Sequence, residues 1–286
     1  PCSIHDIAGA KLYAEKLNQL ARAVADRFLI VMRVYIEKPR TALGWKGLLH
    51  DPHLDGSHRI EQGLSSSREL LIHLAELGLP TACEFLDPIS FLYLGDLISW
   101  GCIGARTTTS QVHRQLASLL PMPVAFKNST DGNIENAVNG CLYASQPHTF
   151  LSMNEEGYLS LHNSKGNPDT HIVLRGGEGK TNYDPQSIEN ALQLLKKASL
   201  PERLIIDCSH GNAEKKHDKQ LNAFNSVMEQ VRQGNSYIRG LMLESYLEEG
   251  NQPIHHDQTQ LKFGVSVTDP CLSWKETESL ILEACK

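Results

Sequence analysis

The chain has 286 residues, of which 27 are basic and 33 acidic, so its formal net charge is −6. This balance argues against general nucleic-acid binding, which needs a basic surface to displace counterions. Hydrophobic residues make up an ordinary 41%, and the longest apolar run in strand-like sequence, Phe28–Met32, is far too short to cross a membrane.

Short β-branched runs alternate with longer amphipathic segments, a pattern typical of parallel β/α units. In chain order the predicted elements are helix Ile7–Asp26, strand Phe28–Ile36, helix Ser66–Leu77, strand Thr81–Phe85, helix Ser90–Trp100, strand Cys102–Arg106, helix Ser110–Leu120, strand Val124–Lys127, helix Asn133–Ser145, strand His171–Arg175, helix Pro185–Ala198, strand Leu204–Cys208, helix Lys219–Gln233, strand Ile238–Leu243 and helix Trp274–Cys285.

These elements predict an α/β fold of the (β/α)8 or TIM-barrel class, with residues 1–286 as a single barrel domain. The first helix has no strand before it, so we expect the missing strand directly upstream of Pro1 and absent from this chain. An open sheet without this strand is the alternative.

Several connections are longer than ordinary β/α loops. They are the polar segments Thr41–Ser65, Asn212–Lys219 and Glu248–Leu261. Phe150–His162 alternates around Asn154–Gly157, which predicts a β-hairpin at about residues 150–162, inserted outside the barrel.

The 7 cysteines are scattered, odd in number and without a C-x-x-C pair. Such usage is typical of a reduced protein rather than a disulfide scaffold. We therefore expect a cytoplasmic protein. The charge balance and the short apolar runs described above lead us to expect neither a nucleic acid nor a membrane as its partner.

Cationic side chains gather at the carboxyl ends of the predicted strands, which in a barrel converge on one rim. They are Arg33, Lys38, Arg40, Arg106, Lys127 and Arg175. Guanidinium groups bind phosphate and carboxylate bidentately, and ammonium groups add compact charge. This rim predicts one or two substrates with several negative charges. The alternative is that each cation pairs with a surface carboxylate.

A second group at the same rim combines Cys2, His210, Glu244 and Asp269. A thiolate, an imidazole and two carboxylates suit one divalent ion, Mn, Fe, Co or Zn. Taken singly, Cys2 as a small buried apolar residue and His210 as a hydrogen-bonded loop residue are the alternatives.

Eight motifs occur in the order found in one enzyme family. They are Pro1–Asp6 (PCSIHD), Arg33–Lys46 (RVYIEKPRTALGWK), Gly104–Gln111 (GARTTTSQ), Phe126–Gly132 (FKNSTDG), Leu174–Gly177 (LRGG), Asp207–Asn212 (DCSHGN), Glu249–Gln252 (EGNQ) and Thr268–Cys271 (TDPC). Through them the chain resembles the microbial type I 3-deoxy-D-arabino-heptulosonate 7-phosphate (DAHP) synthases over essentially its whole length.

The resemblance implies a metal-dependent condensation of phosphoenolpyruvate with D-erythrose 4-phosphate, the first step of the shikimate pathway. It implies metal ligation by Cys2, His210, Glu244 and Asp269, with Cys2, His210 and Lys38 as catalytic residues and Lys38 as a proton donor. The implied substrate-binding residues are Arg33, Lys38, Arg106, Lys127 and Arg175 for phosphoenolpyruvate, Glu84 near its phosphate, and Arg40 and Thr41 for erythrose 4-phosphate. Pro39 and Ala105 are implied as further substrate-binding residues.

The resemblance also implies a homodimer or homotetramer and an aromatic amino acid as a possible effector. We expect the family's N-terminal extension, which contributes to both, to be missing from this chain. Thr109 stands where the family usually has Glu, and Ser129 where it has Gly.

Three other functions compete with this one. A sibling synthase makes 3-deoxy-octulosonate 8-phosphate, but its loop typically reads KANRS, where Lys38–Thr41 reads KPRT. A Schiff-base aldolase would use Lys127 as its nucleophile. A barrel that binds a phosphorylated metabolite without turnover would be a sensor.

Overall fold

The chain folds into two compact units in this computed structural model, which describes residues 1–255 and 257–286. The first unit comprises Pro1–Glu84, Asp96–Ser99 and Glu244–Lys286, and the second comprises Phe85–Gly95 and Trp100–Leu243. Position 256, in the polar connection expected at 248–261, lies outside the described residues.

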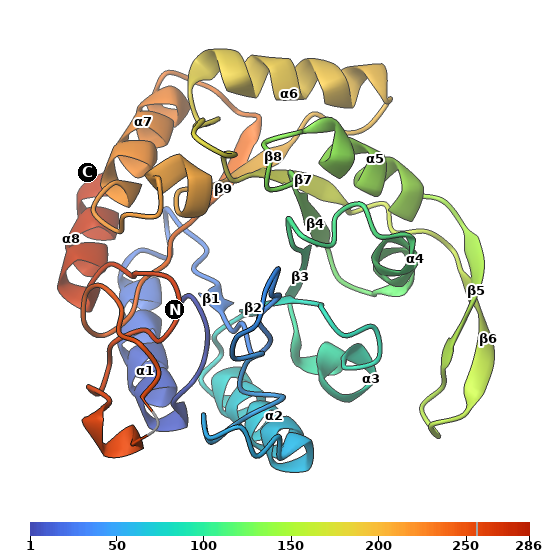
Figure 1. Cartoon of the computed structure of the whole chain (residues 1–286). Coiled ribbons are helices and arrows are strands. Elements are labelled where there is room, and N and C mark those ends of the chain that lie inside the picture. Colours follow the sequence, from blue (N-terminus) through green and yellow to red (C-terminus); the bar gives the residue numbers. More distant parts are fainter. Residues whose placement is uncertain (256) are drawn as a thin grey trace. The chain divides into compact units, whose positions relative to one another are not determined.

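The first unit contains two parallel strands and three longer helices (Figure 1). Its elements are α1 (Ile7–Ala23), β1 (Met32–Arg33), α2 (Ile60–Glu76), β2 (Thr81–Glu84), the short 3-10 helix η3 (Gln258–Gln260) and α8 (Trp274–Ala284). Strands β1 and β2 pair in parallel, with Met32 opposite Thr81. Helix α1 begins where the Asp6 carboxylate accepts hydrogen bonds from the first backbone amides.

Two predicted elements of this part of the chain differ from the structure. The strand predicted over Phe28–Ile36 is regular only at Met32–Arg33. The helix predicted over Ser66–Leu77 begins earlier, at Ile60, and includes Gly63. A Cβ atom on Gly63 would lie 2.1 Å from the Leu49 carbonyl oxygen, so the helix needs glycine there for a close tertiary contact.

The helix predicted over Ser90–Trp100 is also wrong in its extent. The segment forms a single turn, α3 (Phe91–Leu94), followed by the 3-10 helix η1 (Gly95–Leu97). Trp100 already begins strand β3 (Trp100–Ile103).

The second unit is a parallel β/α arrangement in which the strand order follows the chain, β3-β4-β7-β8-β9. The elements after β3 are α4 (Gln111–Leu119), β4 (Val124–Lys127), α5 (Glu135–Ala144), β5 (His148–Met153), β6 (Leu159–Ser164), β7 (His171–Leu174), α6 (Pro185–Lys197), β8 (Leu204–Asp207), the 3-10 helix η2 (His210–Ala213), α7 (Gln220–Arg232) and β9 (Ile238–Met242). A helix follows each of β3, β4, β7 and β8, which places their carboxyl ends at one edge.

Helix α5 packs directly on strand β4 at Gly140. A Cβ atom on Gly140 would lie 2.5 Å from the Phe126 ring, and Phe126 is fully buried. The apolar core of this unit therefore holds α5 close to the sheet and fixes where β4 ends.

Strands β5 and β6 form a separate antiparallel pair, seen as a two-stranded ribbon in Figure 1. The pair runs from His148 opposite Ser164 to Met153 opposite Leu159. This is the segment for which the sequence predicts a hairpin, and the strands extend two residues beyond each predicted end. Asn154 closes the turn by accepting a hydrogen bond from the Tyr158 amide.

The structure confirms the α/β class and the parallel pairing of strands within each unit. Within residues 1–255 and 257–286, no helix has the length and apolar character needed to cross a membrane.

Replacing Ser273 by alanine should destabilise the protein, because Ser273 forms a capping box with Glu276 at the N-terminus of α8. Its hydroxyl accepts from the Glu276 amide, while the Glu276 carboxylate accepts from the Ser273 amide. Loss of such a cap costs about 1 kcal/mol of unfolding free energy. Urea denaturation of Ser273→Ala measures the cost, and Ser279→Ala, on the exposed surface of the same helix, should change stability by less than about 0.5 kcal/mol. Equal effects of the two variants would contradict the capping role.

Candidate active site

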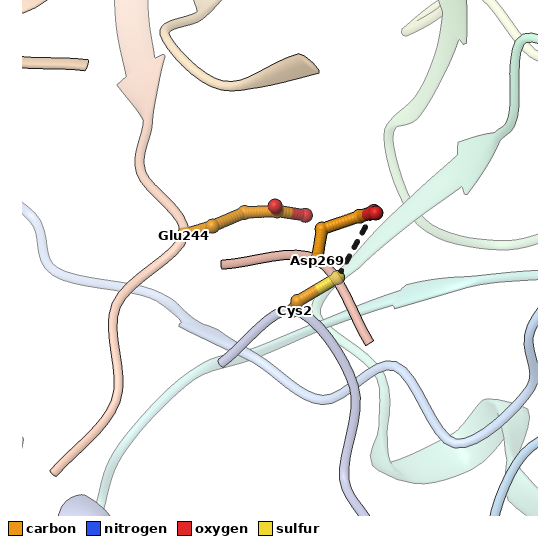
Figure 2. A group of neighbouring side chains, drawn as sticks. All are labelled: Cys2, Glu244 and Asp269. Atoms are coloured by element: carbon orange, nitrogen blue, oxygen red, sulfur yellow. Dashed lines mark hydrogen bonds between the residues drawn. The ribbon is translucent and has the colours of Figure 1, made fainter. Parts of the chain in front are cut away.

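Three of the four predicted metal ligands lie together in the first unit. Figure 2 shows the side chains of Cys2, Glu244 and Asp269 lying together, on three separate stretches of chain. One ligand atom from each lies within 4.8 Å of the others, and the Cys2 thiol donates to Asp269 Oδ2 at 3.4 Å. Cys2 and Glu244 are buried, whereas half of the Asp269 side chain is exposed.

Backbone pairing brings these distant residues together. The Ile4 amide donates to the Tyr35 carbonyl, which holds the segment after Cys2 beside the extension of β1. The Leu272 amide donates to the Glu244 carbonyl, which joins the chain after β9 to the loop before α8. Cys2 therefore lies beside two residues that are more than 200 positions away in sequence.

Two predicted substrate-binding cations contact this acidic group directly. Arg33 donates to Glu244 Oε1 at 2.7 Å and to the Cys2 carbonyl at 3.1 Å. Its guanidinium lies 3.8 Å from the centre of the Tyr35 ring. Lys38 Nζ donates to Cys2 Sγ at 3.0 Å and lies 3.7 Å from Asp269 Oδ2. Both cations are buried. Their positive charges therefore need the nearby Glu244 and Asp269 carboxylates to compensate for the loss of hydration.

Burial raises the pKa of the Cys2 thiol to about 12, with the neighbouring Glu244 carboxylate adding to the rise and Lys38 opposing it. The thiol is therefore protonated in this arrangement. Burial lowers the pKa of Lys38, but the nearby Asp269 and Glu244 carboxylates raise it, and the pKa stays above the ordinary value. Lys38 therefore stays charged.

The donor set in the first unit suits a divalent metal ion. One sulfur and two carboxylates with converging ligand atoms are a combination that Mn, Fe, Co and Zn accept. The Cys2 proton would leave on binding, because the thiolate is the ligand.

The loop after β1 carries the residues predicted to bind erythrose 4-phosphate. The Lys38 amide donates to the Lys46 carbonyl, so the loop folds back on itself. Arg40 Nε donates to the Trp45 carbonyl at 2.7 Å. Arg40 and Thr41 are exposed and Pro39 is half-buried, an arrangement that leaves this end of the loop accessible to a phosphate group.

Glu84 ends strand β2 and is buried, with 6% of its surface exposed. Its Oε1 atom has no hydrogen-bond partner within the described part of the chain. A buried carboxyl oxygen without a partner is costly, so this position is suited to receive a donor from a ligand or from water.

A second charged group occupies the second unit. Lys127, at the end of β4, donates to Asp207 Oδ2 at 2.7 Å. His210 Nδ1 lies 3.0 Å from the same oxygen, and Ser209 donates to Asp207 Oδ1. Asp207 is fully buried. Asp207 therefore orients both Lys127, which is predicted to bind phosphoenolpyruvate, and His210, which is predicted to bind the metal.

His210 has a backbone φ of 54°, in the left-handed region that non-glycine residues seldom occupy. Such strain is retained where surrounding contacts impose it, often at functional sites. The Lys215 amide bonds to the His210 carbonyl, and Asp207 holds the ring. His210 is half-buried and belongs to the other unit from Cys2, Glu244 and Asp269.

The remaining predicted residues of the second unit lie at the carboxyl ends of strands. Ala105 and Arg106 follow β3, with Arg106 exposed. Arg175 follows β7 and is buried. Sequence reasoning assigned no role to Asp207 or to the asparagines near Lys127 and His210, although they lie inside the motifs quoted above. The signal for Asp207 was an acidic residue at the end of an otherwise apolar strand.

The sequence profile of the DAHP synthetase I family matches residues 1–282. The chain belongs to this family. The resemblance found in the motifs is thereby confirmed, and the protein is an enzyme of the transferase class that acts in the shikimate pathway of aromatic amino acid biosynthesis.

Individual family members agree with this assignment over nearly the whole chain. The Tyr-sensitive phospho-2-dehydro-3-deoxyheptonate aldolase of Escherichia coli (strain K12) is 50% identical over 283 residues, which are 99% of this chain and 79% of the relative. The Trp-sensitive enzyme of the same strain is 49% identical over 281 residues, 98% of this chain and 80% of the relative. The solved phospho-2-dehydro-3-deoxyheptonate aldolase from Francisella tularensis SCHU S4 is 44% identical, with a TM-score of 0.96 over 100% of this chain and 83% of that one.

Proposed function

We propose that the protein condenses phosphoenolpyruvate with D-erythrose 4-phosphate and water to give DAHP and inorganic phosphate, and that it needs a divalent metal ion. Family membership supports the reaction. The observation that carries the metal requirement is the convergence of Cys2, Glu244 and Asp269 within 4.8 Å.

In this proposal Cys2, His210, Glu244 and Asp269 hold one Mn, Fe, Co or Zn ion. The ion would supply Lewis-acid polarisation of the aldehyde oxygen of erythrose 4-phosphate. Lys38 would donate the proton that this oxygen takes up, and its charge and its hydrogen bond to Cys2 support this role.

The cationic residues bind the two substrates. Phosphoenolpyruvate is bound by Arg33, Lys38, Ala105, Arg106, Lys127 and Arg175, with Glu84 near its phosphate, and erythrose 4-phosphate by Pro39, Arg40 and Thr41. Carbon 3 of phosphoenolpyruvate then attacks the aldehyde carbon, which leaves carbon 2 cationic. Water adds at carbon 2 and loses one proton to the solvent. The bond from carbon 2 to the phosphate oxygen then breaks as the carbonyl forms, and the remaining hydroxyl proton leaves with the phosphate. Fixing both substrates in contact supplies much of the rate acceleration.

We propose further that residues 1–286 belong to one (β/α)8 barrel domain, with the β5–β6 hairpin inserted outside the barrel. The parallel strands, each followed by a helix, and the likeness to the Francisella tularensis structure support this. We also propose a cytoplasmic homodimer or homotetramer. An aromatic amino acid effector is supported by the Tyr-sensitive and Trp-sensitive relatives.

A phosphate-release assay with two aldehyde substrates tests the reaction. The protein, treated with a chelator and reloaded with Mn²⁺, should release phosphate from phosphoenolpyruvate with erythrose 4-phosphate and not with arabinose 5-phosphate. Without metal, turnover should be lost. Preference for arabinose 5-phosphate, borohydride trapping on Lys127, or binding without turnover would each overturn the proposal in favour of a different function.

A further inference from the structure

Three buried asparagines connect the strand ends of the second unit. Asn128 follows β4, Asn182 lies in the loop between β7 and α6, and Asn212 lies in η2 after β8. Their exposed fractions are 0%, 7% and 2%. None of the three is assigned to a substrate or to a metal above, although buried amide side chains are costly unless fully hydrogen-bonded.

The Asn128 side chain joins β4 to β7. Its Oδ1 accepts from the Arg175 amide at 2.8 Å, and its Nδ2 donates to the Gly176 carbonyl at 2.9 Å. Asn128 therefore fixes the backbone on both sides of the Arg175–Gly176 peptide bond. It also directly follows Lys127 in sequence. It therefore couples the positions of Lys127 and Arg175, two residues predicted to bind phosphoenolpyruvate.

Asn182 and Asn212 extend the same network to β8. Asn182 donates from Nδ2 to Asn128 Oδ1 at 3.2 Å and accepts at Oδ1 from the Gly176 amide at 2.7 Å. The Asn182 amide donates to Asn212 Oδ1 at 2.8 Å. Asn212 Nδ2 donates to the Asp207 carbonyl at 2.9 Å, which ties the network to the strand that precedes His210.

The backbone segments around the three asparagines are packed closely against one another. Gly176 has a φ of 70°, and a Cβ atom there would lie 2.5 Å from the Asn212 amide nitrogen. The Gly211 amide donates to the Arg175 carbonyl at 3.0 Å. The loops after β7 and β8 are thus in direct backbone contact, and the asparagines set their register.

We propose that Asn128, Asn182 and Asn212 are positioning residues that hold Lys127 and Arg175 in the geometry required for binding phosphoenolpyruvate, and that Asn212 ties this network to the strand before His210. The roles of Lys127 and Arg175 in substrate binding rest on the function proposed above. An amide suits these positions, because each asparagine donates and accepts at once, which neither a carboxylate nor an alkyl group can do. Site geometry tolerates errors of only about 0.5 Å, so the network acts on binding as well as on stability.

The test compares two buried asparagines that make the same number of side-chain hydrogen bonds. Asn128 makes four, to Ser129, Arg175, Gly176 and Asn182. Asn167 also makes four, to Ala117, Leu120, Met122 and Asp169, and has no contact with the three strand ends. Asn128→Ala and Asn167→Ala should therefore lower the melting temperature comparably.

Only Asn128→Ala should raise the KM for phosphoenolpyruvate, by about tenfold to 100-fold, because small misplacements of binding groups are that costly. The KM for erythrose 4-phosphate should change less than about threefold, since Arg40 and Thr41 lie in the other unit. An unchanged KM for phosphoenolpyruvate in Asn128→Ala, or an equal rise in Asn167→Ala, would overturn the proposal.

Two further measurements keep the test decisive. Asn182→Ala should reproduce the effect if Asn128→Ala does not fold, and the double variant should lose little more than either single one, because a connected network fails as a unit. Calorimetric titration with phosphoenolpyruvate alone gives the same comparison without turnover. If the unaltered protein binds phosphoenolpyruvate but does not condense it, the proposed function fails while the positioning role is still measured.

Discussion

Cys2→Ala is expected to abolish condensation and to weaken divalent metal binding by at least about 100-fold, because loss of an outer-shell partner alone costs 10-fold to 100-fold. Cys2 is the only sulfur in the group with Glu244 and Asp269 among the described residues, and it also accepts from Lys38. Its removal takes away one metal ligand and one contact of the proposed proton donor.

Equilibrium dialysis against Co²⁺ measures the affinity, and the thiolate-to-cobalt absorption band should vanish with Cys2. Cys141→Ala is the matched control, since Cys141 is an equally buried thiol in α5. It should leave both the affinity and the absorption band unchanged. A Cys2→Ala protein that binds Co²⁺ as tightly as the unaltered chain would disprove Cys2 as a ligand.

Asp207→Asn should destabilise the protein by about 3–5 kcal/mol, the usual cost of removing one partner of a buried ion pair. Asp207 is fully buried and lies 2.7 Å from Lys127 Nζ and 3.0 Å from His210 Nδ1. An asparagine would leave the buried Lys127 ammonium without the charge of this carboxylate. Turnover should fall at least about 100-fold, because a binding group and a metal ligand would both lose their orientation.

Urea denaturation of three variants separates the contributions to this effect. Adding Lys127→Met to Asp207→Asn should restore much of the stability, because the buried ammonium is gone, but none of the turnover. Asp96→Asn removes one partner of the exposed pair with Arg68, at 2.8 Å, and should cost less than about 1 kcal/mol. Equal losses in Asp207→Asn and Asp96→Asn would show that the buried pair contributes no special stability.

Secondary structure was predictable where local signals agreed with packing. The strand over Val124–Lys127 has its predicted ends, and the helix over Pro185–Ala198 differs by one residue. Proline at the first helical position and an aspartate before it mark this helix start without reference to the rest of the fold. The predicted start of α2 was wrong because Gly63 lowers the local helix propensity. Glycine is required there because the Leu49 carbonyl lies too close for a side chain.

The sequence by itself determined the family, through eight motifs in order, and the kinds of side chain at the strand ends, because residue type and spacing are properties of the chain alone. Only the tertiary structure decided which cationic side chain pairs with which carboxylate. Arg33 bonds to Glu244 across 211 positions and Lys127 to Asp207 across 80. Pairing depends on distance and burial in three dimensions, and several carboxylates in the chain could have served each cation equally well.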